Sequence, residues 1–275
     1  MATIQKDYLK QKLIQGQNIY GTCITSFTPQ WPKIVADSNL DFVFLDTEHI
    51  PLNRTELSIM CRNYQALGVT PIVRIPGPDP YRASQVIDDG AVGVIVPYIE
   101  HSNQIKGLIG AVKYRPLKGE KLEEFLEEKA TPSAKLESYL NKYNFGNLCF
   151  ANIESVPAVE RLDELLSIKG LDGVFIGPHD LSINMGIPEQ YDHPEFIQAV
   201  KKIVQKARSN TLGVGIHFSQ EPLRQIEWMK EGVNIIIHSS DMALFSKQLR
   251  HDMDKIRSST SNIHKSGFFD DTIVV

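Results

Sequence analysis

The sequence predicts a (β/α)₈ barrel, and two observations support this prediction. Eight short runs rich in Val, Ile, Leu and Phe alternate with longer amphipathic segments along the 275 residues. Such nearly continuous apolar runs are typical of parallel strands that are covered on both faces. Eight strands alternating with helices over about 250 residues is also the pattern of this barrel. A doubly wound open sheet is the alternative, but it usually has a glycine-rich turn after its first strand, and this sequence has none.

The expected elements follow in chain order. Strands are predicted over residues 19–26, 41–46, 70–75, 92–99, 148–153, 173–176, 212–218 and 233–238. Amphipathic helices are predicted over residues 82–88, 156–169 and 195–204. Gly68, Gly170 and Gly232 each follow a predicted helix and precede a strand, so we expect them to be left-handed helix ends. Residues 1–257 would then form a single barrel.

Two segments lie outside this alternation. Residues 117–146, between the fourth and fifth strands, are rich in Glu and Lys and longer than an ordinary connection. We expect a solvated helical insertion there, with a lid or a subunit contact as the alternative. Residues 258–275 form a polar tail with an apolar end, which is either disordered or docked on a neighbour.

Composition narrows the class of protein. The chain is 42% hydrophobic and 23% charged, a composition that excludes a protein disordered over its whole length. Its net charge of −4 argues against the excess of basic residues that is typical of nucleic-acid-binding proteins. No run is long enough to predict a membrane span, and the first residues do not resemble a signal peptide. The three scattered cysteines indicate neither a disulfide framework nor a thiolate zinc site, so we expect a cytoplasmic protein.

Polar residues gather where the predicted strands end, which is where barrels of this kind place their chemistry. Glu154 and Asp180 end neighbouring strands, and two such carboxylates suit an octahedral divalent ion with open positions. Mg²⁺, Mn²⁺ or Co²⁺ is therefore favoured over Zn²⁺. The alternative for Asp180 is a simple helix cap. The backbone from Gly177 to Asp180, with donors on His179 and Asp180, could also bind an anion.

A second group of strand-end residues suggests acid–base chemistry. Arg74 could clamp a substrate carboxylate, or it could form a structural salt bridge with Asp46 or Glu48. Asp46 could orient His49 as a general base, although a rim histidine satisfied by the backbone is the alternative. For His217 a structural role is favoured. No lysine lies in a strand or at a strand end, so a Schiff-base mechanism is not expected.

At these residues the sequence resembles the HpcH/HpaI aldolase family of metal-dependent class II pyruvate aldolases. The matching segments fall between residues 19 and 250. They are LDTEHIP (45–51), VRIP (73–76), DDGA (88–91), IES (153–155) and DGVFIGPHDLS (172–182).

The resemblance implies a phosphoenolpyruvate/pyruvate-type barrel in a homo-oligomer, a hexamer or trimer, with the C-terminal helix exchanged between subunits. It also implies a role for each site residue. Glu154 and Asp180 would bind the metal, His49 paired with Asp46 would be the base, and Arg74 would stabilise pyruvate and its enolate. Asp88 would reach a neighbouring subunit's site.

The sequence also departs from the family pattern. Asn152 replaces a common glutamine near the substrate carbonyl, and His179 stands where a small residue is usual. These changes surround the expected substrate site rather than the metal site, which suggests retained enolate chemistry with an altered partner.

The leading hypothesis is a lyase that cleaves or forms 4-hydroxy-2-oxo acids from pyruvate and an aldehyde. Two alternatives stay open. One is a lyase or synthase acting on acyl-CoA or oxaloacetate-type acids, for which Lys106, Lys113, Arg115 and Lys118 could form a phosphate entrance or simply a solvated surface. The other is a non-catalytic metabolite-binding homologue.

Overall fold

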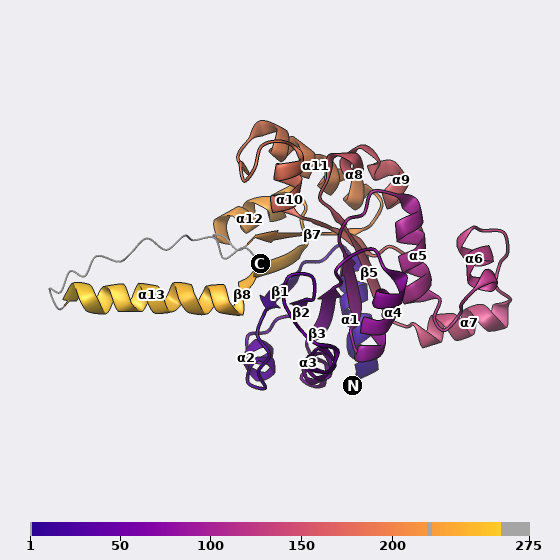
Figure 1. Ribbon diagram of the computed structural model, residues 1–275, viewed down its shortest axis with the longest axis horizontal. Helices are drawn as coiled ribbons and strands as arrows, with labels where there is room; N and C mark the ends of the chain where they lie inside the picture. Colours follow the sequence, from indigo (N-terminus) through magenta and orange to yellow (C-terminus); the bar gives the residue numbers. More distant parts are fainter. Residues whose placement is uncertain (1, 219–221, 260–275) are drawn as a thin grey trace.

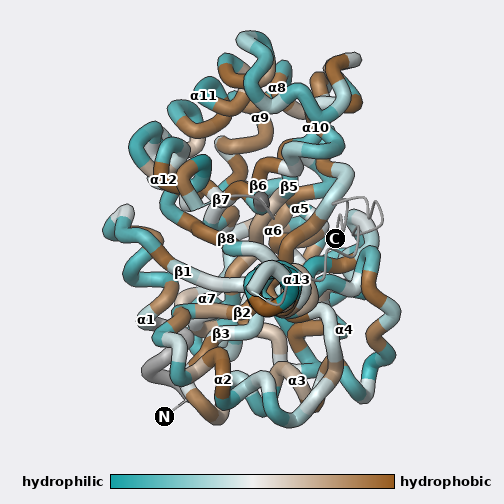
Figure 2. The backbone as a smooth tube through the Cα atoms, turned by 90° about the vertical axis from the view of Figure 1, so that its left-hand side faces the viewer, coloured by the Kyte–Doolittle hydropathy of each residue, from teal (hydrophilic) through white to brown (hydrophobic). Residues whose placement is uncertain are grey.

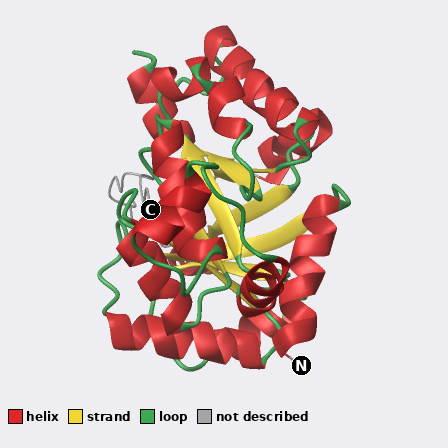
Figure 3. Cartoon of the chain, turned by 90° about the vertical axis from the view of Figure 1, so that its right-hand side faces the viewer, coloured by secondary structure: helices red, strands yellow, loops and turns green. Residues whose placement is uncertain are grey.

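The computed structural model describes residues 2–218 and 222–259, and its centre is a closed barrel of eight parallel strands (Figures 1 and 3). The strands pair in sequence order, and β1 closes the ring against β8. They are β1 (Ile19–Ile24), β2 (Phe42–Asp46), β3 (Thr70–Arg74), β4 (Gly93–Val96), β5 (Leu148–Ile153), β6 (Gly173–Ile176), β7 (Gly213–Phe218) and β8 (Ile235–Ser240). The predicted (β/α)₈ barrel is thus confirmed.

Helices surround the strands. The first half of the chain contributes α1 (Ala2–Ile14), α2 (Trp31–Asp37), α3 (Arg54–Ala66), α4 (Pro80–Asp89), α5 (Ser102–Lys113), α6 (Glu120–Leu126) and α7 (Ala134–Tyr143). The second half contributes α8 (Val156–Glu160), α9 (Leu162–Leu166), α10 (Pro178–Asn184), α11 (Pro194–Ser209), α12 (Pro222–Glu231) and α13 (Asp241–Ser259). The helix predicted over 156–169 is in fact two short helices, α8 and α9.

The core has two layers because successive strand residues point to opposite faces. Side chains such as Val43 and Leu45 pack between the strands and the surrounding helices. Phe42 and Phe44, which alternate with them, fill the barrel interior. Leu9 and Leu13 of α1 join this interior cluster, so α1 closes the amino-terminal end of the barrel. The opposite end, where the strands terminate, is left for chemistry.

The backbone is left-handed at all three predicted glycines, with φ of 92° at Gly68, 97° at Gly170 and 115° at Gly232. Gly68 and Gly232 lie at the ends of α3 and α12, as predicted, whereas Gly170 lies four residues beyond the end of α9, in the turn before β6. The predicted insertion folds as α6 and α7, which lie to one side of the barrel in Figure 1. The predicted tail begins within the last residues of α13, and residues 260–275 lie outside the described residues. No helix in the described chain is long and apolar enough to cross a membrane.

Helix α13 extends away from the barrel (Figure 1), and Figure 2 looks nearly along its axis. Asp241 anchors its first turn by accepting hydrogen bonds from Thr25 and Ser26 after β1. Beyond that anchor the helix carries a stripe of apolar side chains spaced three or four residues apart. These residues are Met242, Phe245, Leu249, Met253 and Ile256. All but Met253 are exposed, so the described residues of the chain give this apolar stripe little cover.

Candidate functional site

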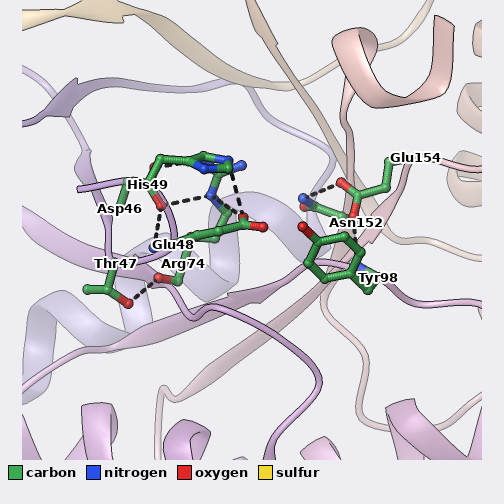
Figure 4. Close-up of polar contacts among 8 residues, drawn as sticks. All are labelled: Asp46, Thr47, Glu48, His49, Arg74, Tyr98, Asn152 and Glu154. Atoms are coloured by element: carbon green, nitrogen blue, oxygen red, sulfur yellow. Dashed lines mark hydrogen bonds and ion pairs between the residues drawn. The ribbon is translucent and has the colours of Figure 1, made fainter. Parts of the chain in front are cut away.

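The predicted strand-end residues meet at the carboxyl-terminal mouth of the barrel (Figure 4). Strand pairing explains part of this arrangement, since Asp46 at the end of β2 is the register partner of Arg74 at the end of β3. The side chains of both residues are therefore held at the same level. Thr47 strengthens this corner, because its hydroxyl and its N–H both donate to the carbonyl of Arg74, at 2.7 and 3.0 Å.

Arg74 forms a two-pronged ion pair with Asp46. Its Nε lies 2.9 Å from Oδ1 and its Nη2 lies 2.7 Å from Oδ2, and Asp46 is completely buried. Glu48 adds a second carboxylate, with Oε2 3.2 Å from the Nε atom. These contacts use Nε and Nη2, and Nη1 has no hydrogen-bond partner among the described residues. The predicted salt bridge therefore exists, and one edge of the guanidinium remains available to an anion.

This ion pair changes the pKa values of both partners. Burial by itself would raise the pKa of Asp46, but the hydrogen bonds and charge of Arg74 outweigh it and hold that pKa below its usual value. Burial would lower the pKa of Arg74, and the carboxylates of Asp46 and Glu48 raise it instead. Both groups are therefore charged at neutral pH.

The arrangement around His49 differs from the expected Asp46–His49 pair. Asp46 is occupied by Arg74 and by the N–H of Glu48. The carboxylate beside His49 is that of Glu48, with Oε2 3.7 Å from Nε2. The reason is the strand register, which places Arg74 rather than the histidine opposite Asp46. The side chain of His49 is 52% exposed and lies at the open side of the site.

The two predicted metal-binding carboxylates converge above Gly177. A Cβ on Gly177 would lie 2.8 Å from Oε2 of Glu154 and 3.5 Å from Oδ2 of Asp180. A side chain at this position would occupy the space between the two oxygens. Asp180 is not the cap of α10, because Gly177 is the N-cap and Asp180 lies in the first turn. Its carboxylate is therefore not used for capping, which removes the alternative considered for it.

Glu154 is buried and held at both oxygens. The N–H of Tyr98 donates to Oε1 at 2.7 Å, and Nδ2 of Asn152 donates to Oε2 at 2.9 Å. Burial raises the pKa of Glu154, and the charges of Asp180 and Glu48 add to this effect. A bound cation would offset the cost of gathering these carboxylates. The residues present therefore fit a divalent ion with oxygen ligands, although no group of three or more potential ligands occurs among the described residues.

The remaining predicted residues lie at different distances from this centre. Asn152 is buried, and its Oδ1 has no hydrogen-bond partner among the described residues. His179 is partly exposed in the first turn of α10, and its Nδ1 is 3.4 Å from Glu189. Asp88 lies near the end of α4, toward the closed end of the barrel, and pairs with Arg115. It cannot reach the mouth of its own chain.

His217 on β7 belongs to the barrel interior. It lies on the same face of the strand as Gly215, where a Cβ would strike Phe175 of the interior cluster. Its ring is 5.7 Å from that of Phe44. Burial, helped by the charge of Arg74, lowers its pKa to about 4, so the ring is neutral at pH 7. Its Nε2 is buried without a hydrogen-bond partner among the described residues.

Two site residues were not predicted as functional. Glu48 was considered only as a structural partner of Arg74, although the acidic residue directly before His49 was a usable signal. Tyr98 lies just beyond β4, within the range predicted as the fourth strand, and no polar residue was expected to act there. Its position depends on a left-handed backbone with φ of 57°, which sequence alone does not reveal.

Similarity to known proteins extends along nearly the whole chain. The family model described as HpcH/HpaI aldolase/citrate lyase matches residues 20–247. A 2-keto-3-deoxy-L-rhamnonate aldolase of Escherichia coli O1:K1 is 26% identical over 261 residues, covering 94% of this chain and 97% of the relative. The protein of the same name from strain K12 is 27% identical over 250 residues, covering 90% and 92%.

Solved structures agree with this result. An HpcH/HpaI aldolase from Desulfitobacterium hafniense superposes with a TM-score of 0.79 at 25% identity, covering 95% of this chain and 99% of that one. The citrate synthase SbnG superposes with a TM-score of 0.76, also at 25% identity, covering 92% and 98%. Aldolases and a citrate synthase thus share this architecture.

Proposed function

Because the chain belongs to the HpcH/HpaI aldolase/citrate lyase family, we propose that it is a metal-dependent aldolase acting on 4-hydroxy-2-oxo acids. In cleavage such an acid would yield pyruvate, by way of its enolate, and an aldehyde. The observation that carries the proposal is the convergence of Glu154 and Asp180 above Gly177, beside the Arg74 cluster. The similarity to 2-keto-3-deoxy-L-rhamnonate aldolases supports the same reaction class.

Glu154 and Asp180 are the proposed ligands of Mg²⁺, Mn²⁺ or Co²⁺. When bound, such a cation supplies positive charge that polarises a carbonyl group and stabilises an enolate. Asn152 and the N–H of Tyr98 would keep Glu154 oriented, since each holds one of its two oxygens. The bare Oδ1 of Asn152 and the backbone from Gly177 to His179 are proposed to border the bound 2-oxo acid.

Arg74 and His49 are proposed to handle charge and protons. Arg74 would bind the carboxylate of the 2-oxo acid or its developing oxyanion, because Asp46 and Glu48 orient the guanidinium and leave Nη1 available. His49 would take the proton from the C4 hydroxyl in cleavage and return it in synthesis. In this structure Glu48 rather than Asp46 is positioned to support the protonated imidazole.

The subunit arrangement is also a proposal. The apolar stripe of α13 is the kind of surface that another copy of the chain would cover, which supports a homo-oligomer with exchanged C-terminal helices. In such an assembly Asp88 would act in a neighbour's site. The buried, unpaired thiols of Cys23, Cys61 and Cys149 support a cytoplasmic location.

A synthase acting on oxaloacetate-type acids is the second candidate, supported by the similarity to SbnG. A CoA thioester substrate has less support. Lys113 pairs with Asp172 and donates to the carbonyl of Asn147, just before β5, which places it at the closed end of the barrel. Arg115 is likewise occupied by Asp88. These cations are therefore poorly placed to form an entrance at the mouth.

Exchange of the pyruvate methyl protons in D₂O tests the proposed enolate chemistry. With Mg²⁺ present, the ¹H NMR methyl signal should fade, and EDTA should stop the loss. Glu154→Gln should abolish it because one metal ligand loses its charge, whereas Glu160→Gln on α8 is the matched control. A folded wild-type protein that gives no exchange with Mg²⁺, Mn²⁺ or Co²⁺ would contradict the proposal.

A further inference from the structure

Tyr98 has a backbone conformation that aromatic residues seldom adopt. Its φ is 57°, in the left-handed region, where a side chain crowds the backbone. Such conformations persist where surrounding contacts hold them, and they concentrate at functional sites. Hydrogen bonds hold the backbone N–H and the carbonyl of Tyr98 here. The N–H donates to Glu154 at 2.7 Å, and the carbonyl of Tyr98 accepts from Nε2 of Gln104 at 3.0 Å.

The held backbone places the phenol ring at the open side of the site. Figure 4 shows the ring between Glu48 and the Asn152–Glu154 pair. The side chain is not a packing element, since Tyr98 is 57% exposed. A tyrosine phenol keeps its proton at neutral pH, so its hydroxyl is a hydrogen-bond donor at the open side of the site.

The site has a deep part, where a first substrate would be enclosed, and an outer part that is exposed to solvent. Arg74 and Asn152 lie deep in the barrel mouth, where a small 2-oxo acid would be enclosed. Tyr98 and His49 lie further out and are both more than half exposed. A second substrate arriving after the 2-oxo acid would therefore meet these two side chains first.

We propose that Tyr98 is a catalytic residue for the second substrate and donates a hydrogen bond from its phenol to the aldehyde oxygen. This inference rests on the proposed aldolase function. In synthesis, C3 of the pyruvate enolate forms a bond to the aldehyde carbon, and the π electrons of the carbonyl move to its oxygen. That oxygen takes a proton from protonated His49. Tyr98 keeps its own proton throughout and stabilises the negative charge that develops on the oxygen.

The test is Tyr98→Phe, which removes the hydroxyl and keeps the backbone N–H that holds Glu154. Two rates are measured: exchange of pyruvate methyl protons without aldehyde, and aldol addition with the best wild-type acceptor among acetaldehyde, glycolaldehyde and succinate semialdehyde. The ratio of addition to exchange should fall by about 10²-fold, as for loss of one oxyanion donor. Tyr81→Phe, at an exposed tyrosine in the first turn of α4, is the matched control and should keep the wild-type ratio.

Each outcome separates the two proposals. An unchanged ratio in Tyr98→Phe, or exchange and addition falling together, would overturn the role of the phenol. Exchange by the wild-type protein without addition to any of the three aldehydes would overturn it too. No exchange by the wild-type protein would overturn the aldolase function and the inference with it. Tyr98→Gly provides a second variant, because glycine tolerates the positive φ and retains the N–H, and it should lower the ratio at least as much.

Discussion

Replacing Gly177 by alanine should weaken metal binding specifically. The backbone at Gly177, with φ of −84° and ψ of 94°, suits alanine as well as glycine. The obstacle is the new methyl group, which would lie 2.8 Å from Oε2 and 3.0 Å from Cβ of Glu154. Glu154 must therefore move. Because each of its oxygens accepts a hydrogen bond, it cannot turn aside without losing the bond to Tyr98 or to Asn152.

These contacts set the size of the effect. Disturbing the groups that orient a metal ligand typically costs 10- to 100-fold in affinity. At a metal concentration far above both dissociation constants, that loss corresponds to about 1.4–2.7 kcal/mol less stabilisation by the metal. Without metal, a steric cost of about 1–3 kcal/mol is partly offset by the stiffer unfolded chain, by about 0.4–1 kcal/mol. The metal-dependent part of the stability is therefore the informative quantity.

Urea unfolding in EDTA measures the stability of the metal-free protein, and unfolding at a series of Mn²⁺ concentrations measures the stabilisation that the metal adds. Gly77→Ala is the matched control, because Gly77 lies on the same rim and a Cβ there would meet nothing within 4 Å. The control should keep the wild-type metal dependence. Wild-type metal dependence in Gly177→Ala would refute the reasoning, since it would mean that Glu154 does not bind the ion in the position described.

Two further predictions concern regions away from the metal. His217 has a pKa lowered to about 4 in the folded protein, against an ordinary value near 6.5, so the unfolded chain takes up its proton first as the pH falls. The stability that depends on a neutral His217 is fully present above pH 6.5 and is lost as the pH falls toward 4. In His217→Leu, the free energy of unfolding should therefore depend less steeply on pH between 6.5 and 4. An equal pH dependence in the variant and the wild type would contradict the lowered pKa of His217. On α13, Phe245→Glu should dissociate the oligomer in light-scattering chromatography, because it charges the apolar stripe, while His251→Glu on the opposite face should not. A wild-type protein that is already monomeric would contradict the helix exchange.

The local pattern of the chain was enough to predict the barrel. Strands buried on both faces are apolar throughout, and helices that pack on a sheet have apolar residues every three to four positions. Both patterns can therefore be recognised within a short segment of sequence. The positions of Asp46 and Arg74 at strand ends, and of Glu154 and Asp180 shortly after β5 and β6, could be predicted for the same reason. Closing a parallel barrel brings all its strand ends to one mouth.

Which side chains meet at that mouth was decided by the tertiary structure. Asp46 faces Arg74 because β2 and β3 pair in that register, and no spacing within one segment encodes a register between two. Glu154 and Asp180 converge above Gly177 because β5 and β6 are neighbours and the glycine leaves space between the carboxylates. Tyr98 enters the site only because contacts from Glu154 and Gln104 hold it in an unfavourable conformation, and residues distant in sequence supply those contacts.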